Sequence, residues 1–184
     1  EGGVRMRVLM SFTEGKSAAV RALLRRAVAE EYGLRGLRIE KTEHGKPYFP
    51  ERPDIYFSLS HTDGAVLCAV SSSPVGCDVQ IHRPVHERVP ERVCAPEELR
   101  QMDFFDLWAL KESWIKLRGL LDRPLREIVF TASDGIITAP PCVTDTAVPM
   151  PVFARVYGGL GDYSAAVCSA EDGIPDAIEI AEVP

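Results

Sequence analysis

The sequence lacks the features that mark several classes of protein. Its five cysteines include no C-x-x-C pair, and an odd number without metal-ligand spacing is typical of a reduced, cytosolic protein and not of a disulfide framework. No apolar run approaches the ~18 residues of a membrane span, and we recognise no signal peptide. The net charge of −6 argues against a general nucleic-acid surface. We therefore expect a cytoplasmic protein without membrane or nucleic-acid partners.

What the sequence contains is typical of a globular protein. Its 184 residues are 46% hydrophobic and 26% charged, enough for one large domain or two small halves around a shared core. Hydrophobic periodicity and turn signals predict the main elements. The predicted helices are 14–32 and 106–118, and the predicted strands are 7–12, 54–61, 65–70, 75–81, 125–130, 136–138, 152–157 and 163–168. Strands and helices segregate in runs, which indicates an α+β fold.

The segment 106–119 carries the pattern W-x-x-K-E-S-x-x-K-x-x-G on a predicted helix closed by a glycine. Four apolar residues share one face of this helix and should pack on a core: Leu107, Leu110, Trp114 and Leu117. Lys111 falls inside that apolar arc, where a lysine must snorkel or meet an anion. Glu112 and Lys116 lie four residues apart. They form either a surface pair contributing ~0.2–0.5 kcal/mol or part of a functional site.

The predicted helix 14–32 begins near Gly15-Lys16-Ser17, which is similar to the end of a Walker A loop. The glycine required five residues earlier is absent, because position 10 is Met10, so we exclude a P-loop. Lys16 and Ser17 could still hold a phosphate through the free N–H groups of a helix N-terminus. The alternative, favoured by spacing alone, is that Ser17 is an ordinary N-cap.

Three further segments carry polar residues in positions where ligands bind. Gly45-Lys46-Pro47 is a turn signal with a lysine at its tip, and it closes a basic stretch that begins at Arg35. Ser60 and His61 end a predicted strand beside a turn, where binding residues are common, although a lone histidine there is more often polar surface. Asp78 and Gln80 project from the same face of a strand, within reach of one hard cation; the alternative is an ordinary polar face.

Together these segments resemble one enzyme family. In chain order they read G-K-P (45–47), L-S-H (59–61), V-G-C-D-V-Q (75–80) and W-x-x-K-E-S-x-x-K (108–116). The Sfp-type (surfactin-synthetase-activating) 4′-phosphopantetheinyl transferases carry G-K-P, an S-H after a strand, G-[IV]-D-x-E and W-x-x-K-E-[SA]-x-x-K in the same order. The resemblance extends from residue 16 to residue 168, nearly the whole chain.

This resemblance implies a fold and a reaction. It implies a pseudo-twofold monomer of two similar α+β halves, residues 1–83 and 84–184, with coenzyme A bound in the cleft between them. The reaction is the Mg²⁺-dependent transfer of 4′-phosphopantetheine from coenzyme A to a serine of an acyl or peptidyl carrier protein. The by-product is adenosine 3′,5′-bisphosphate.

The resemblance also assigns roles to residues. The metal ligands are Asp78, Gln80 and Glu112, and the catalytic residues are Glu112, Lys116 and Glu97, the last near a glutamate that positions or deprotonates the nucleophile in some members. The residues that would bind the coenzyme are Lys16, Ser17, His44, Gly45, Lys46, Pro47, Ser60, His61, Thr62, Lys111 and Lys116. Lys111 is included because a contact with phosphate would explain its place in the apolar arc.

Gln80 stands where most members of the family have a glutamate. An amide oxygen can still coordinate a metal, but the lost negative charge predicts weaker Mg²⁺ binding than with a glutamate. Gln80 therefore leaves open a non-catalytic or weakly active homologue that binds carrier protein or coenzyme A. A different Mg²⁺-dependent nucleotide-processing enzyme is the third reading.

Overall fold

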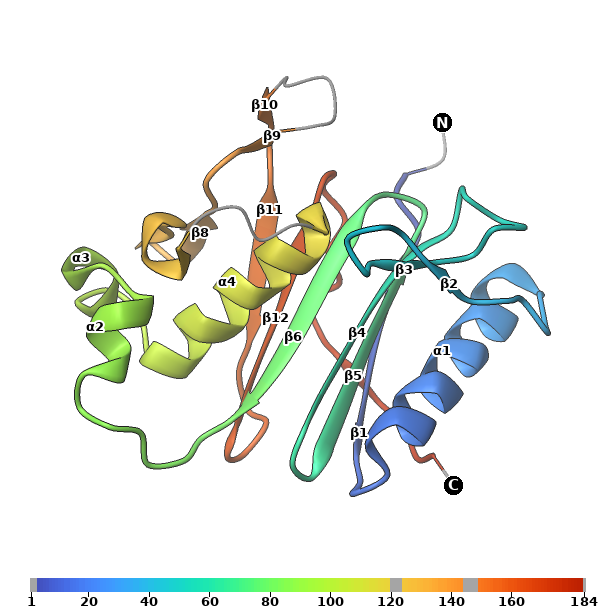
Figure 1. Ribbon diagram of the computed structural model, residues 1–184, viewed down its shortest axis with the longest axis horizontal. Helices are drawn as coiled ribbons and strands as arrows, with labels where there is room; N and C mark the ends of the chain where they lie inside the picture. The colour runs from blue at the N-terminus through green and yellow to red at the C-terminus, as the bar shows by residue number, and fades with distance from the viewer. Residues whose placement is uncertain (1–2, 120–123, 144–148, 184) are drawn as a thin grey trace.

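The computed structural model describes residues 3–119, 124–143 and 149–183. It confirms the predicted α+β class, with two main sheets side by side (Figure 1). The first sheet has the strand order β13-β1-β5-β4, with bounds Glu179–Ile180, Met6–Phe12, Ala65–Ser71 and Tyr56–Thr62. The second has the order β11-β12-β6, with bounds Phe153–Tyr157, Tyr163–Ser169 and Val75–Ile81.

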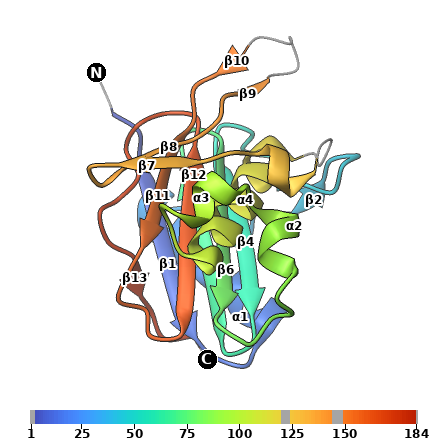
Figure 2. The same ribbon diagram turned by 90° about the vertical axis from the view of Figure 1, so that its left-hand side faces the viewer.

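Each sheet carries one long helix on its outer face. Helix α1 (Lys16–Tyr32) covers the first sheet and α4 (Phe104–Arg118) covers the second, so that α4 lies in front of the sheets and α1 behind them in Figure 2. Apolar residues of β5 alternate between two cores because successive side chains point to opposite faces. Val66, Cys68 and Val70 contact α1, whereas Ala65, Leu67 and Ala69 join a core shared with β6 and β12.

Helix α4 follows the predicted pattern closely. Its predicted apolar face is buried: Leu107, Leu110, Trp114 and Leu117. The helix begins where the Asp103 carboxylate accepts a bond from the Phe105 N–H, and it ends at Gly119, which has a left-handed φ of +75°. Gly76 allows this helix to approach β6, because a Cβ there would lie only 1.9 Å from the Ser113 carbonyl oxygen.

The remaining elements are short. They are β2 (Glu40–Lys41), β3 (Pro47–Tyr48), α2 (Val89–Val93), α3 (Pro96–Leu99), the 3-10 turn η1 (Leu125–Glu127), β7 (Thr131–Ser133), β8 (Ile136–Thr138), β9 (Cys142–Val143) and β10 (Pro149–Met150). The predicted strand 125–130 is wrong. Its first residues form η1. The carbonyl groups of Leu125 and of Ile128, which follows η1, accept hydrogen bonds from the buried Lys111 ammonium and not from a neighbouring strand.

The two sheets meet along β4 and β6. The Cys77 N–H donates to Ser58 Oγ at 2.9 Å and the Val79 N–H donates to Ser60 Oγ at 3.2 Å, so serine hydroxyls of β4 satisfy backbone groups of β6. The sheets do not divide at the predicted boundary after residue 83. β6 pairs with β12 of the C-terminal segment, and β13 returns to pair with β1. The pseudo-twofold relation stays a prediction.

The structure also bears on two features noted in the sequence. All five cysteines are buried. Among the described residues, no helix combines the length and the apolar character that crossing a membrane requires.

Candidate active site

Asp78 lies at the centre of a polar cluster where β4, β6 and α4 meet. Its carboxylate is buried and accepts three hydrogen bonds. Ser60 Oγ donates to Oδ1 at 2.8 Å, Lys116 Nζ lies 2.7 Å from the same oxygen, and Gln80 Nε2 donates to Oδ2 at 2.6 Å. A charge buried at this depth requires such partners. The strand therefore holds a carboxylate already organised by one cation and two neutral donors.

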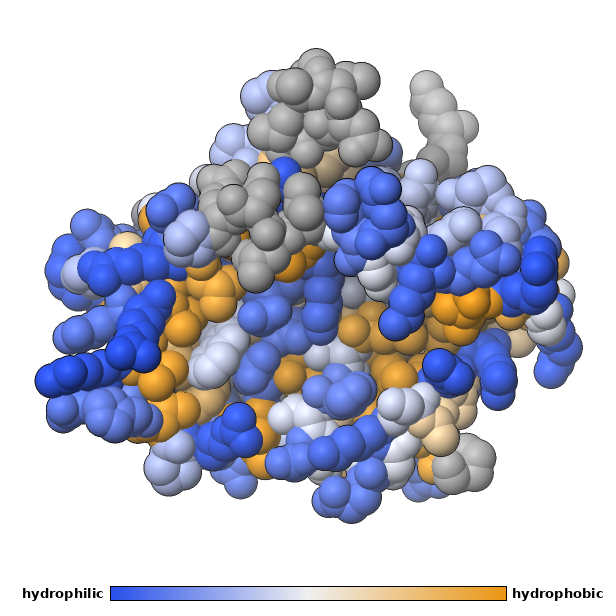
Figure 3. Space-filling model, in the orientation of Figure 1, coloured by the Kyte–Doolittle hydropathy of each residue, from blue (hydrophilic) through white to orange (hydrophobic). Residues whose placement is uncertain are grey.

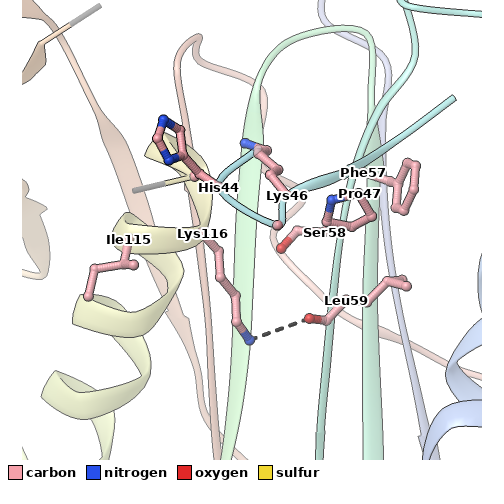
Figure 4. Close-up of a pocket in the computed structure, with 10 residues that line it drawn as sticks. His44, Lys46, Pro47, Phe57, Ser58, Leu59, Ile115 and Lys116 are labelled. Atoms are coloured by element: carbon pink, nitrogen blue, oxygen red, sulfur yellow. Dashed lines mark hydrogen bonds between the residues drawn. The ribbon is translucent and has the colours of Figure 1, made fainter. Parts of the chain in front are cut away.

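Lys116 reaches this cluster from α4. Figure 4 shows its side chain extending from the helix toward β4, where Nζ lies 3.4 Å from the Leu59 carbonyl oxygen. Burial alone would lower the pKa of Lys116, but the adjacent Asp78 carboxylate outweighs that effect, and the pKa is raised. The lysine is therefore a fixed positive charge at neutral pH.

Glu112 supplies the second carboxylate, one helical turn before Lys116. Its pKa is raised, first by burial and then by repulsion from Asp78. The predicted surface pair with Lys116 is not the arrangement found, because the Lys116 ammonium bonds to Asp78. Because Asp78 raises the proton affinity of Glu112, an added cation between the two carboxylates would be stabilised.

A pocket of about 420 Å³ opens beside this cluster (Figure 4). Hydrophilic side chains gather over this part of β6, next to α4 (Figure 3). The pocket is lined by the four residues of the turn 44–47, by Lys116 and by residues of β4. The turn residues and Lys116 belong to the predicted coenzyme-binding set. The lining consists of His44, Gly45, Lys46, Pro47, Phe57, Ser58, Leu59, Ile115, Lys116 and Gly119.

Lys46 lines the same pocket as Lys116. Its Nζ donates to the Leu117 carbonyl at 2.6 Å, near the C-terminal end of α4, where helix carbonyls lack partners. Burial lowers the pKa of Lys46 to about 8. Two lysines from distant parts of the chain thus border one pocket, an arrangement suited to a ligand with several negative charges.

The other predicted coenzyme-binding residues lie around this centre. Ser60 faces Asp78, whereas the next residue, His61, projects from the other face of β4 and is exposed. Thr62 ends β4. Lys16 pairs with Asp63 at 2.7 Å, at the turn of the β4–β5 hairpin.

The helix start near Lys16 also settles an open alternative. The N-cap of α1 is Gly15, so the interpretation of Ser17 as an N-cap is wrong. Ser17 lies in the first turn, is exposed, and stays available for the predicted phosphate contact.

Lys111 differs from the prediction that it points toward phosphates. Its ammonium is fully buried and donates to Glu98 Oε2 at 2.7 Å, to the Ile128 carbonyl at 2.7 Å and to the Leu125 carbonyl at 3.1 Å. These three bonds use all the donors of the ammonium group. Lys111 therefore anchors α4 to α3 and η1 and does not contribute to the pocket.

The glutamate of this ion pair was missed in the sequence. The predicted catalytic residue Glu97 is exposed on α3, whereas its neighbour Glu98 is buried. Glu98 also accepts from the Ala95 N–H at 2.7 Å and from the Phe130 N–H at 2.8 Å. The sequence Ala95-Pro96-Glu97-Glu98 could have indicated the role of Glu98. A glutamate at the third helical position reaches back to the N-cap N–H, which here belongs to Ala95.

The fold and the pocket together define an α+β protein with a pocket lined by two lysines. The family model described as the 4′-phosphopantetheinyl transferase superfamily matches residues 74–168. A 4′-phosphopantetheinyl transferase of Bacillus subtilis is 33% identical over 172 residues, which cover 86% of this chain and 75% of the relative. The chain belongs to the 4′-phosphopantetheinyl transferase superfamily.

Other relatives agree with this assignment. The 4′-phosphopantetheinyl transferase Sfp of Bacillus subtilis (strain 168) is 31% identical over 170 residues, covering 85% of this chain and 74% of the relative. The 4′-phosphopantetheinyl transferase psf-1 of Bacillus pumilus is 34% identical over 109 residues, covering 53% and 47%. These similarities support the Sfp-type resemblance inferred from the motifs.

Proposed function

We propose that this protein transfers 4′-phosphopantetheine from coenzyme A to a serine of an acyl or peptidyl carrier protein and releases adenosine 3′,5′-bisphosphate. The observation that carries the proposal is a pocket lined by Lys46 and Lys116, in which Lys116 also bonds to Asp78, the carboxylate that raises the pKa of Glu112. The names of the relatives support the same reaction. We further propose that the protein acts in the cytoplasm, because its five cysteines include no C-x-x-C pair, and that it is a monomer.

The donor set fits Mg²⁺, which prefers one or two carboxylates together with water and phosphate oxygens. Asp78 and Glu112 would hold the ion, and the Gln80 amide would complete the set. No three His, Cys, Asp or Glu side chains form a metal-binding group in the described part of the chain. When bound, Mg²⁺ supplies positive charge that offsets the charge developing on the pyrophosphate.

The protein's own side chains would act on the rest of the substrate. Lys116 and Lys46 face the pocket from two sides and would hold phosphate oxygens, which lowers the barrier where negative charge develops. The raised pKa of Glu112 makes it a better acceptor for the proton of the attacking serine. Glu97 is the alternative acceptor and would need a bridging water.

A mass-shift assay tests this function. Incubation with coenzyme A, Mg²⁺ and a carrier protein should add about 340 Da, the mass of the phosphopantetheine group, to the carrier. A carrier whose acceptor serine is replaced by alanine is the control for the site of transfer. Absence of a mass gain with fatty-acid, polyketide and peptide carriers alike would refute the proposal.

Glu112→Ala should abolish the transfer while the circular dichroism spectrum and the unfolding midpoint stay close to those of the wild type. Its carboxylate is half-buried beside Asp78, forms no ion pair within the described residues and accepts a hydrogen bond only from the Trp108 side chain of its own helix, so we expect the fold to persist without it. Glu87→Ala, which changes an exposed glutamate of the loop after β6, is the matched control and should keep full activity. Unfolding of the Glu112 variant would instead indicate a structural role.

Gln80 is the specific observation that favours a second candidate, a binding homologue with little or no turnover. Activity of the wild type removes this candidate. A large gain of activity in Gln80→Glu from a baseline near zero would support it.

A further inference from the structure

A second cavity, of about 620 Å³, lies between α1 and the segment 34–41. Its floor is apolar and consists of Leu24, Val28, Ala29, Leu34, Leu37, Ile39 and Phe49. It shares no lining residue with the pocket at Lys116. In Figure 3 an apolar area lies between α1 and β2 and is bordered by hydrophilic side chains. The cavity is therefore a separate feature of the first half of the chain.

Four cations surround this cavity. Arg21 and Arg25 stand one turn apart on α1, and Arg35 and Lys41 lie on the segment across from the helix. None of these four side chains forms a hydrogen bond or an ion pair with another described residue. The one acidic residue of the lining, Glu40, already bonds to Arg38 and Tyr48.

Neighbouring arginines outside the cavity are all neutralised. On α1, Arg26 pairs with Glu30 at 3.0 Å and with Glu179 at 3.3 Å. On the opposite segment, Arg38 pairs with Glu51 at 2.6 Å. In a protein with a net charge of −6, four cations without an ion pair thus lie together at the rim of one apolar hollow. This pattern is the electrostatic complement of an anion.

We propose that this cavity binds a small amphiphilic anion, with an alkyl chain or ring in the apolar floor and a carboxylate or phosphate head at the arginines. Its volume lies within the range of about 300–1,000 Å³ found for small-molecule sites. The apolar floor removes the chain from water, and the unpaired guanidinium groups bind the head in charge-assisted hydrogen bonds. The site is distinct from the proposed transfer reaction.

Calorimetric titration of the full chain with two defined probes, octanoate and octyl phosphate, tests the proposal and separates the two head groups. Binding of either probe at 1:1 is expected, and the tighter one identifies the head. Acetate, inorganic phosphate and octanol, which carry the head or the chain alone, should bind at least about tenfold more weakly. Equal binding of octanol and octanoate would overturn the role of the cations.

Paired variants locate the site. Arg25→Gln combined with Arg35→Gln should weaken binding of the preferred probe about tenfold or more, because one of the four rim cations is lost on each side of the cavity. Arg26→Gln combined with Arg38→Gln, the same change on the same two elements outside the cavity, should leave affinity within about twofold. The melting temperature reports whether each variant is folded.

Coenzyme A distinguishes the cavity from the transfer pocket. Saturating coenzyme A should leave the affinity for the probe unchanged, and Arg25→Gln with Arg35→Gln should keep the wild-type transfer rate. Equal loss of probe binding in both double variants would overturn the proposal. Displacement of the probe by coenzyme A would also overturn it, because the cavity would then be an extension of the donor site.

Discussion

Asp78 and Gln80 show how a single residue sets the chemistry of the pocket. The Gln80 amide donates to Asp78 Oδ2 at 2.6 Å. This contact is attractive, whereas a second carboxylate at position 80 would repel Asp78. A glutamate would bind a cation more tightly but would leave two carboxylates in contact when the cation is absent. If the proposed metal site lies here, Gln80 lowers its metal affinity and stabilises the metal-free protein.

Replacing Gln80 by glutamate tests both effects. Without Mg²⁺, Gln80→Glu should lower the free energy of unfolding by about 1 kcal/mol or more, because it removes a buried hydrogen bond and adds repulsion. With Mg²⁺, the melting temperature of the variant should rise more steeply than that of the wild type, since the added carboxylate strengthens binding. Gln101→Glu, at an exposed site, is the matched control. An identical Mg²⁺ response in wild type and Gln80→Glu would show that Gln80 is not at the metal site.

Lys46 should make coenzyme binding pH-dependent. Burial lowers its pKa from 10.5 to about 8, so the folded protein loses this proton while the unfolded chain keeps it. Between about pH 8 and pH 10.5 its contribution to stability therefore rises with pH, and below pH 8 it is constant because both states are protonated. A phosphate ligand needs the ammonium form, so the Kd of coenzyme A should rise about fivefold from pH 8 to pH 9.

Lys46→Met provides the control for that pH profile. The variant should bind coenzyme A more weakly at pH 7, and its Kd should change little between pH 7 and pH 9. Titration calorimetry at fixed ionic strength measures both profiles. The same slope in Lys46→Met and in the wild type would assign the pH dependence to another group.

At the scale of elements, α4 shows what periodicity predicts and where it stops. The buried face of Leu107, Leu110 and Trp114 is encoded within the helix itself, because residues three and four apart share a face. The position of Lys111 in the apolar arc was likewise visible. Its partners were not, because Glu98 and two carbonyl groups come from α3 and the η1 region, and only the packing of three elements brings them together.

The buried ion pair gives a prediction that separates the structural role of Lys111 from the role first inferred. Lys111→Met leaves Glu98 buried without its cation, so unfolding in urea should show a loss of about 3–5 kcal/mol. Glu98→Gln added to Lys111→Met should restore part of that loss, since a neutral amide can keep the backbone partners. The exposed Lys41→Met should change stability by less than about 0.5 kcal/mol.

The same variants also report on the coenzyme. At a temperature where Lys111→Met remains folded, its Kd for coenzyme A should equal that of the wild type, because the ammonium lies outside the pocket. Weaker binding of coenzyme A at unchanged stability would show that Lys111 does bind the phosphates.

For the whole molecule, the order of strands was predictable but their partners were only partly so. The β4–β5 and β11–β12 hairpins follow from local alternation and short turns. The pairing of β6 with β12 joins strands that lie far apart in the sequence, and β13 contributes two residues, too short for any alternation to reveal. The predicted boundary after residue 83 therefore separates β6 from β12, although these two strands pair in one sheet. The active-site cluster depends on a second contact between strands that are not neighbours in the chain, because it forms where β4 meets β6.

This interweaving predicts that the two sheets unfold together. The chain has buried, free thiols in both: Cys68 on β5, Cys77 on β6 and Cys168 on β12. Because β6 bonds to β4 through serines and to β12 through its backbone, neither sheet can open without exposing the other. Pulsed thiol labelling in urea, read by mass spectrometry, should give the same midpoint for Cys68 and Cys168. Labelling of Cys168 at a lower urea concentration than Cys68 would show independent halves, as a division after residue 83 requires.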